Sequence, residues 1–141
     1  VVVSALGGIT NLLTEMLSLA QSGDKNYKDH LPFVEKRHLE TIKKCVPIQY
    51  QSAIISFLKK HLNELESRLD AIHLLEEATP KNNAAISAYG ELLSSNIIQE
   101  IFSFNGIDCV LKDSRDLITT LHHNGKEVVD QYSSYNNIKK Y

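Results

Sequence analysis

The sequence contains little of what several classes of protein require. Its two cysteines, Cys45 and Cys109, are too few for a disulfide scaffold and are not spaced like metal ligands, so they suit a reducing compartment, packed as small hydrophobes. No apolar run reaches the roughly 18 residues of a membrane-spanning helix. Fifteen Lys and Arg against 17 Asp and Glu give a formal net charge of −2, and no basic stripe predicts a nucleic-acid partner. These absences exclude a zinc finger, a secreted mini-protein and a membrane-spanning protein.

What is present is the composition of an ordinary globular domain, with 43% hydrophobic and 23% charged residues. A length of 141 residues corresponds to one domain or to part of a larger one. The sequence begins with three valines rather than methionine, and it ends within the first turns of a predicted helix for which Ser133 or Ser134 is the expected N-cap. We therefore expect it to be a piece of a longer protein.

Two apolar runs and one shorter segment are predicted to be strands. Residues 1–4 and 107–112 are apolar runs of the kind found in parallel strands that are buried on both faces. Residues 126–130 are a candidate for a third, short strand. Because long helical segments separate the first two runs, the order strand, helices, strand predicts an α/β fold that is predominantly helical, with few strands.

Apolar residues at helical spacing predict helices over 12–21, 31–46, 48–78, 83–104 and 117–121. The third of these carries a heptad seam, which predicts packing against another helix as a hairpin. The seam consists of Ile55, Leu58, Leu62, Leu65, Leu69 and Ile72.

The loop after the first predicted strand is a candidate anion site. Gly7 and Gly8 permit a tight turn, and Thr10 or Asn11 is a suitable N-cap for the next helix. Ligands of open α/β sheets bind where strands end and helices begin, because free N–H groups there attract phosphate or carboxylate. Ser4 and Thr10 would then face an anion; the alternative is a tight turn with a capping threonine. The loop lacks the GxxxxGK[ST] pattern of a P-loop.

Gly90 and Glu91 form a second candidate. Glycine inside a helix costs about 1 kcal/mol relative to alanine, so Gly90 indicates close approach of another backbone or of a ligand. Glu91 lies among small and apolar neighbours, where a carboxylate is either paired or oriented toward a ligand. The alternative is a solvent-facing glutamate beside a packing glycine. His122 and His123 have no suitably placed acidic or cysteine partner, and we expect them in a solvated turn.

Three segments, taken in order, resemble the aspartokinases, which are amino-acid kinases that phosphorylate L-aspartate. Residues 2–11 are similar to that family's second strand and loop, V-[VL]-S-A-x-x-x-I-T-N. Residues 87–94 match its Ser-x-x-Gly-Glu-x-x-Ser helix, and residues 113–120 resemble the Asp-x-Arg segment after the next strand. The ordered set covers most of the chain, whereas the helical middle matches in layout more than in residues.

The resemblance implies the three-layer α/β/α fold of amino-acid kinases, with residues 1–141 forming the N-terminal part of the catalytic domain. It implies transfer of the ATP γ-phosphoryl group to the β-carboxylate of aspartate, which gives 4-phospho-L-aspartate on the way to lysine, threonine and methionine. By the family pattern, Thr10 and Glu91 would hold aspartate, with Ser4 beside them. ATP and Mg²⁺ would serve the longer protein, with no metal ligand and no catalytic residue within 1–141.

The family's first strand, with its phosphate-neutralising lysine, and its nucleotide-binding half are not found among these residues. We therefore expect the 141 residues alone to be inactive and to hold no cofactor. The resemblance implies a cytoplasmic, homo-oligomeric parent without nucleic-acid or membrane partners, either a single aspartokinase or a fusion to a homoserine dehydrogenase. The alternatives are another amino-acid kinase, or a helical interaction module that uses the heptad seam.

Overall fold

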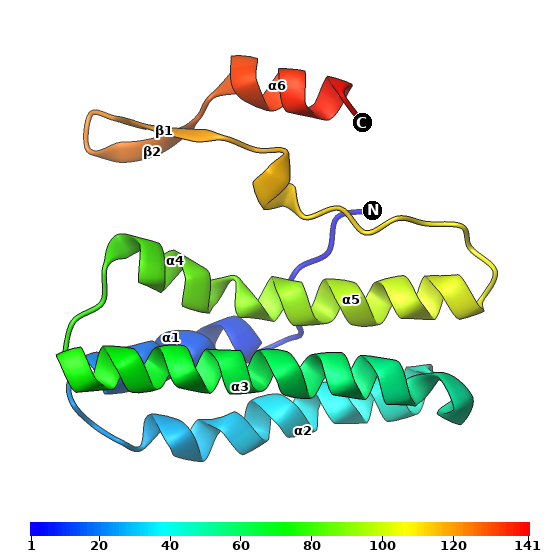
Figure 1. The fold of residues 1–141 in the computed structure, drawn as a ribbon, viewed down its shortest axis with the longest axis horizontal. Coiled ribbons are helices and arrows are strands. Elements are labelled where there is room, and N and C mark those ends of the chain that lie inside the picture. The colour runs from blue at the N-terminus through cyan, green and yellow to red at the C-terminus, as the bar shows by residue number, and fades with distance from the viewer. The chain divides into compact units, whose positions relative to one another are not determined.

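The chain folds into two units, Val1–Cys109 and Val110–Tyr141, in a computed structural model that describes all residues from 1 to 141. In the first unit, successive long helices run in opposite directions (Figure 1). The long helices are α1 (Ile9–Gln21), α2 (Tyr27–Cys45), α3 (Gln51–Leu75) and α5 (Tyr89–Phe104), with the short η1 (Ile48–Tyr50) before α3 and α4 (Pro80–Ser87) before α5.

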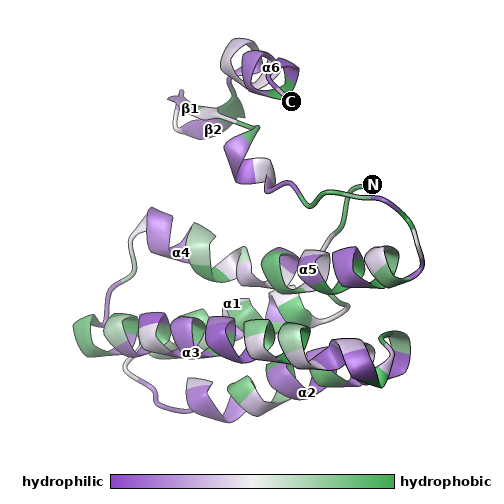
Figure 2. Cartoon of the chain, turned by 45° about the vertical axis from the view of Figure 1, so that its right-hand side comes forward, coloured by the Kyte–Doolittle hydropathy of each residue, from purple (hydrophilic) through white to green (hydrophobic).

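Helix α3 is central to this unit because it packs against α1, α2 and α5. Hydrophobic and hydrophilic positions alternate around its turns (Figure 2), so that one stripe faces the other helices. The predicted seam is buried, except that Ile54 rather than Ile55 is the buried residue at its start. The buried residues of α3 are Ile54, Leu58, Leu62, Leu65, Leu69 and Ile72. The seam therefore packs within the chain.

Local chemistry divides the helices. Glu76, in a left-handed conformation with φ of 50°, ends α3 earlier than predicted. Thr79 caps α4, and its hydroxyl accepts a hydrogen bond from the Asn82 N–H at 3.2 Å, with Pro80 at the first helical position. The predicted helix over 83–104 is consequently two helices, α4 and α5, which are separated at Ala88.

The two predicted strands of a buried sheet are not formed. Residues 1–4 and 107–112 contain no strand, and Val1 and Val2 are fully exposed. A β-branched run becomes a strand only where a neighbouring strand pairs with its N–H and C=O groups. No segment of this chain pairs with either run.

The second unit contains a β-hairpin followed by a short helix. Asp130 is the N-cap of that helix and accepts a hydrogen bond from the Ser133 N–H at 3.1 Å, so the prediction of Ser133 or Ser134 as the cap is wrong. Asp130 precedes both serines, and its carboxylate accepts hydrogen bonds from the N–H and from the hydroxyl of Ser133, so the helix begins before either serine can cap it. The elements are η2 (Ser114–Asp116), β1 (Thr120–His123), β2 (Lys126–Val129) and α6 (Gln131–Lys139).

The hairpin confirms the short strand predicted over 126–130 and contradicts the helix predicted over 117–121. Its two strands are antiparallel, with Leu121 opposite Val128. Asn124 and Gly125 at the turn both have positive φ, 52° and 75°, as a two-residue hairpin turn requires. This Asn-Gly signal outweighs the short apolar stretch that suggested a helix.

The architecture is therefore mostly helical, with one two-stranded antiparallel sheet. The predominance of helices and the scarcity of strands agree with the prediction, whereas the three-layer amino-acid kinase fold stays a prediction. None of the helices combines the length and the apolarity needed to cross a membrane.

Leu65, at the centre of α3, is fully buried, so its truncation tests how much the seam stabilises the bundle. Leu65→Ala leaves a cavity and is expected to lower the free energy of unfolding by about 2–5 kcal/mol in urea titrations. Leu74→Ala is the control, because Leu74 lies on the same helix and is 83% exposed. It should change the free energy of unfolding by less than about 0.5 kcal/mol. Equal effects of the two changes would contradict a packed seam.

His38 on α2 is fully buried, and its Nδ1 lies 2.7 Å from the Val34 carbonyl oxygen. Burial lowers the pKa of His38 below its usual 6.5, so the unfolded chain takes up a proton below pH 6.5 that the folded chain does not. The free energy of unfolding should fall between pH 7.5 and 5.5, by at most about 1.4 kcal/mol from this group. His38→Leu should remove that part of the slope, and the exposed His123→Leu should not. An unchanged slope in His38→Leu would contradict a buried, neutral imidazole.

Candidate functional site

Gly90 lies in the first turn of α5, at the contact between this helix and the N-terminal segment. A Cβ added at Gly90 would lie 2.7 Å from the Cβ of Ala5, 3.5 Å from Cγ2 of Ile9 and 3.6 Å from Cδ1 of Leu13. The first distance is far inside van der Waals contact, so only glycine permits this approach. Gly90 thus marks the close approach of another backbone segment, as predicted, although it lies in the first turn of a helix and not in the middle of one.

A hydrogen bond next to this contact joins the same two segments. The Ser94 hydroxyl on α5 donates to the backbone carbonyl of Ser4 at 2.7 Å and lies 3.2 Å from the carbonyl of Glu91. Ser94 is fully buried, whereas the side chain of Ser4 is exposed. The N-terminal segment is therefore tied to α5 within one helical turn of Glu91.

The N-terminus of α1 carries free backbone donors. Gly8, with φ of 86°, is the N-cap and makes no side-chain hydrogen bond, so the prediction of Thr10 or Asn11 as the cap is wrong. The Ile9 N–H donates to the Leu6 carbonyl at 3.0 Å, whereas the N–H groups of Thr10 and Asn11 have no acceptor in the chain. Such groups, together with the helix dipole, favour an anion. The exposed Thr10 hydroxyl lies in this turn.

Glu91 lies in the first turn of α5 and is partly exposed. Its carboxylate makes no hydrogen bond and no ion pair with any residue of the chain, so the predicted pairing is not formed. A partly exposed glutamate beside a packing glycine, the alternative stated above, agrees with these contacts, and a role in ligand binding stays a prediction. A carboxylate at this position of a helix is favoured by the dipole in any case. It is also free to accept hydrogen bonds from an ammonium group.

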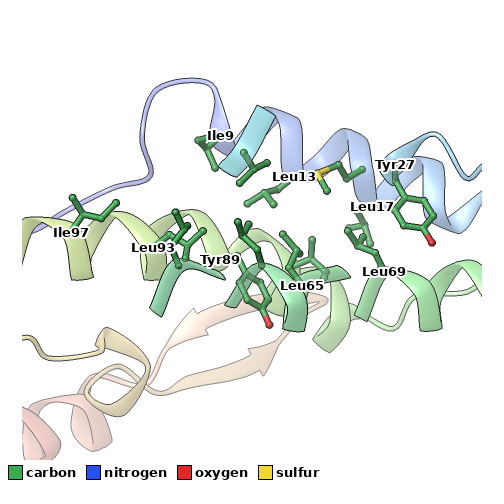
Figure 3. Packing of buried hydrophobic residues seen from close by; sticks show 14 of the residues in the cluster. Ile9, Leu13, Leu17, Tyr27, Leu65, Leu69, Tyr89, Leu93 and Ile97 are labelled. Atoms are coloured by element: carbon green, nitrogen blue, oxygen red, sulfur yellow. The ribbon is translucent and has the colours of Figure 1, made fainter. Parts of the chain in front are cut away.

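The three predicted residues come from segments that meet around Gly90. Ala5 adjoins Ser4, Ile9 adjoins Thr10, and Gly90 adjoins Glu91, and these three neighbours pack together. Figure 3 shows Ile9 and Leu13 of α1 on the side that faces α5. The structure thus brings the backbone segments that carry Ser4, Thr10 and Glu91 together at Gly90, and the site of these three side chains stays a prediction.

Ser94 was not recognised as part of this site from the sequence. It is the last residue of the segment that resembles the family helix, but nothing in the sequence indicates its partner, because the hydrogen bond spans 90 positions. Ala5 was missed for the same reason. An alanine opposite a glycine carries no local signal of the contact.

The third segment that resembles the family lies in the second unit. There Asp113 caps η2, and the Arg115 guanidinium binds its carboxylate, with Nη2 at 2.5 Å from Oδ2. This contact holds the pKa of Asp113 below its usual range. A short 3-10 turn therefore begins directly after Asp113.

Other candidate groups form no site. His122 and His123 lie on strand β1 and not in a turn, and both are exposed as predicted. The prediction that no acidic partner is suitably placed is wrong for His122, because the hairpin puts Glu127 opposite it, with Nδ1 3.2 Å from Oε1. Cys45 is exposed, contrary to prediction, because it ends α2 on its outer side, and Cys109 is half-buried. No three His, Cys, Asp or Glu side chains gather where they could hold a metal ion.

A hollow of about 200 Å³ lies elsewhere, between the second half of α3 and α4. Arg68 at its wall donates to the Tyr89 hydroxyl at 3.1 Å. The hollow contains none of Ser4, Thr10 and Glu91. We place the candidate site at Gly90 because the residues with the appropriate chemistry lie there and not in the hollow.

A compensating pair of substitutions tests the contact at Gly90. Gly90→Ala would force two Cβ atoms together and should lower the free energy of unfolding by about 1–3 kcal/mol. Adding Ala5→Gly removes the opposing Cβ, and the double variant should return to within about 1 kcal/mol of the original chain. Urea denaturation of the four proteins gives the coupling. Additive effects of the two changes would contradict the contact.

No protein-family model matches the chain. The chain is 27% identical over 128 residues to bifunctional aspartokinase/homoserine dehydrogenase 1, chloroplastic, of Arabidopsis thaliana. This match covers 91% of the chain and 14% of that protein. Identity is 26% over 132 residues to the corresponding bifunctional protein of Daucus carota, covering 94% of this chain and 14% of that protein. An aspartokinase of Candida albicans is 24% identical over 111 residues, covering 79% of this chain and 20% of that protein.

The chain thus spans between about a seventh and a fifth of the length of these curated relatives. The matches extend over 79–94% of the chain. They confirm the resemblance carried by the three segments. By sequence, this chain is a relative of the aspartokinases and the bifunctional aspartokinase/homoserine dehydrogenases.

Proposed function

We propose that the protein to which these residues belong transfers the γ-phosphoryl group of ATP to the β-carboxylate of L-aspartate. The observation that carries the proposal is the contact at Gly90, where Ala5 and Ile9, the chain neighbours of Ser4 and Thr10, pack against the chain neighbour of Glu91. The aspartokinase relatives support the same reaction. Aspartate offers an ammonium and two carboxylates, which match the free carboxylate and the free donors of this region.

In this proposal the chain's own residues bind and orient the amino acid. The Thr10 hydroxyl and the N–H groups at the start of α1 receive a carboxylate, and Glu91 receives the ammonium, with Ser4 beside them. A β-carboxylate oxygen attacks the γ-phosphorus while the bond from that phosphorus to the β,γ-bridging oxygen breaks. The products are 4-phospho-L-aspartate and ADP, and no proton is transferred. Catalysis of this kind depends mainly on positioning and on neutralising phosphate charge.

The residues described here supply the amino-acid side of that site. The residues that bind ATP and Mg²⁺ are proposed to lie outside 1–141, because the resemblance assigns phosphate neutralisation and nucleotide binding to segments that are not found among these residues. Since the chain spans only 13–20% of its relatives' length, we expect the 141 residues alone to show no aspartate phosphorylation.

The interaction-module alternative loses its support. It rested on the heptad seam, and the seam residues Leu62 and Leu65 are 7% and 0% exposed within the bundle. A partner helix could not reach them without displacing α1 or α2. The other alternative, a kinase that acts on a different amino acid, is an outcome of the experiment below.

The test uses the full-length protein and detects the acyl phosphate as a hydroxamate. Glu91→Gln removes the charge that faces the ammonium and should raise the KM for aspartate by about 10- to 100-fold. Thr10→Val keeps the branched shape without the hydroxyl and should raise the KM for aspartate less. The KM for ATP should change little in either variant.

Glu100→Gln is the matched control, because Glu100 is a partly exposed glutamate further along α5. Its KM for aspartate should equal that of the original protein. Phosphorylation of another amino acid in place of aspartate would overturn the substrate, and the absence of any amino-acid kinase activity would overturn the proposed function.

A further inference from the structure

We propose that Ser94 is a positioning residue of the amino-acid site, a role that rests on the proposed function. Through its hydroxyl it would fix the Ser4 segment relative to Glu91. Ser94 would not itself touch the substrate, because its side chain is fully buried beneath the segment.

The geometry of the hydroxyl carries this inference. Ser94 Oγ lies 2.7 Å from the Ser4 carbonyl oxygen and 3.2 Å from the Glu91 carbonyl oxygen. A hydroxyl has a single proton, and the shorter distance shows that it is directed mainly at Ser4. One buried group therefore links the backbones of two residues that are proposed to bind the same ligand.

Among residues 1–141, few other contacts hold the N-terminal segment. Residues 1–5 make one hydrogen bond in the whole chain, and it is the bond from Ser94 to Ser4. They pair with no strand, and Val1, Val2 and Ser4 are exposed. The contact of Ala5 with Gly90 limits how close the segment lies to α5, but a contact between two small groups leaves sliding along the helix open. The hydrogen bond sets the register, and hence the position of the Ser4 side chain.

Loss of this bond should therefore act on the amino acid and not on the nucleotide. In the full-length protein, Ser94→Ala should raise the KM for aspartate about three- to tenfold, the range expected for one hydrogen bond. The KM for ATP and the melting temperature should change little. Amide hydrogen exchange of residues 5–9, followed by mass spectrometry, should become at least several-fold faster in the same variant.

Ser95→Ala is the matched control. Ser95 is the next residue of α5, and its hydroxyl donates only to the Leu92 carbonyl of its own helix, at 3.2 Å. This variant should match the original protein in both KM values and in exchange of residues 5–9. Should Ser94→Ala fail to fold, Ser94→Cys, which is close in size but a poor donor, carries the same comparison.

The outcomes separate the inference from the proposed function. An unchanged KM for aspartate in folded Ser94→Ala overturns the positioning role and leaves the proposed function intact. If Ser94→Ala raises the KM for aspartate and the KM for ATP equally and also lowers the melting temperature, Ser94 has only a structural role. That result also overturns the positioning role. If the original protein phosphorylates no amino acid, the proposed function fails and the positioning role fails with it.

Discussion

The close approach of Ala5 to Gly90 is the constraint on which the rest of the candidate site depends. A backbone segment without secondary structure lies against the first turn of α5 only because Gly90 has no side chain, since any Cβ there would lie 2.7 Å from another. That contact places Ser4 near Glu91, and the neighbouring Ile9 brings in the start of α1. The buried hydroxyl of Ser94 then fixes the register. The absence of a Cβ at Gly90 therefore determines which backbone segments can pack together here.

The helical bundle supplies the rigid support for this contact. Helix α3 packs against α1, α2 and α5 through a continuous buried stripe, so the relative placement of α1 and α5 is set by a shared neighbour as well as by their own contact. The polar groups at the start of α1 and α5 lie at the ends of helices anchored in that core. Glu91 and Thr10 consequently stay accessible while the backbones that carry them are fixed.

The sequence predicted those parts of the structure that depend on local signals. The stripe from Leu58 to Ile72 has helical periodicity, the strand predicted over 126–130 is a short segment between polar residues, and the close approach at Gly90 is indicated by a glycine within a helical pattern. The failures depend on distant partners. A valine run is a strand only beside another strand, the cap of α1 is a glycine with positive φ, and the partner of Ser94 lies 90 positions away. Ser4, Thr10 and Glu91 follow from motifs, whereas the sequence carries no signal that Ala5 and Ile9, from distant segments, are the residues that pack against Gly90.

The central claim is that an acidic amino acid binds where α1 and α5 begin. The most direct measurement is amide hydrogen exchange of the full-length protein with and without L-aspartate, followed in peptides that cover residues 5–13, 88–95 and 120–129. The account predicts slower exchange at Thr10 and Asn11, whose N–H groups have no acceptor in the chain, and in the first turn of α5, with no change in the exposed β-hairpin. Protection by aspartate that is confined to other segments would contradict it.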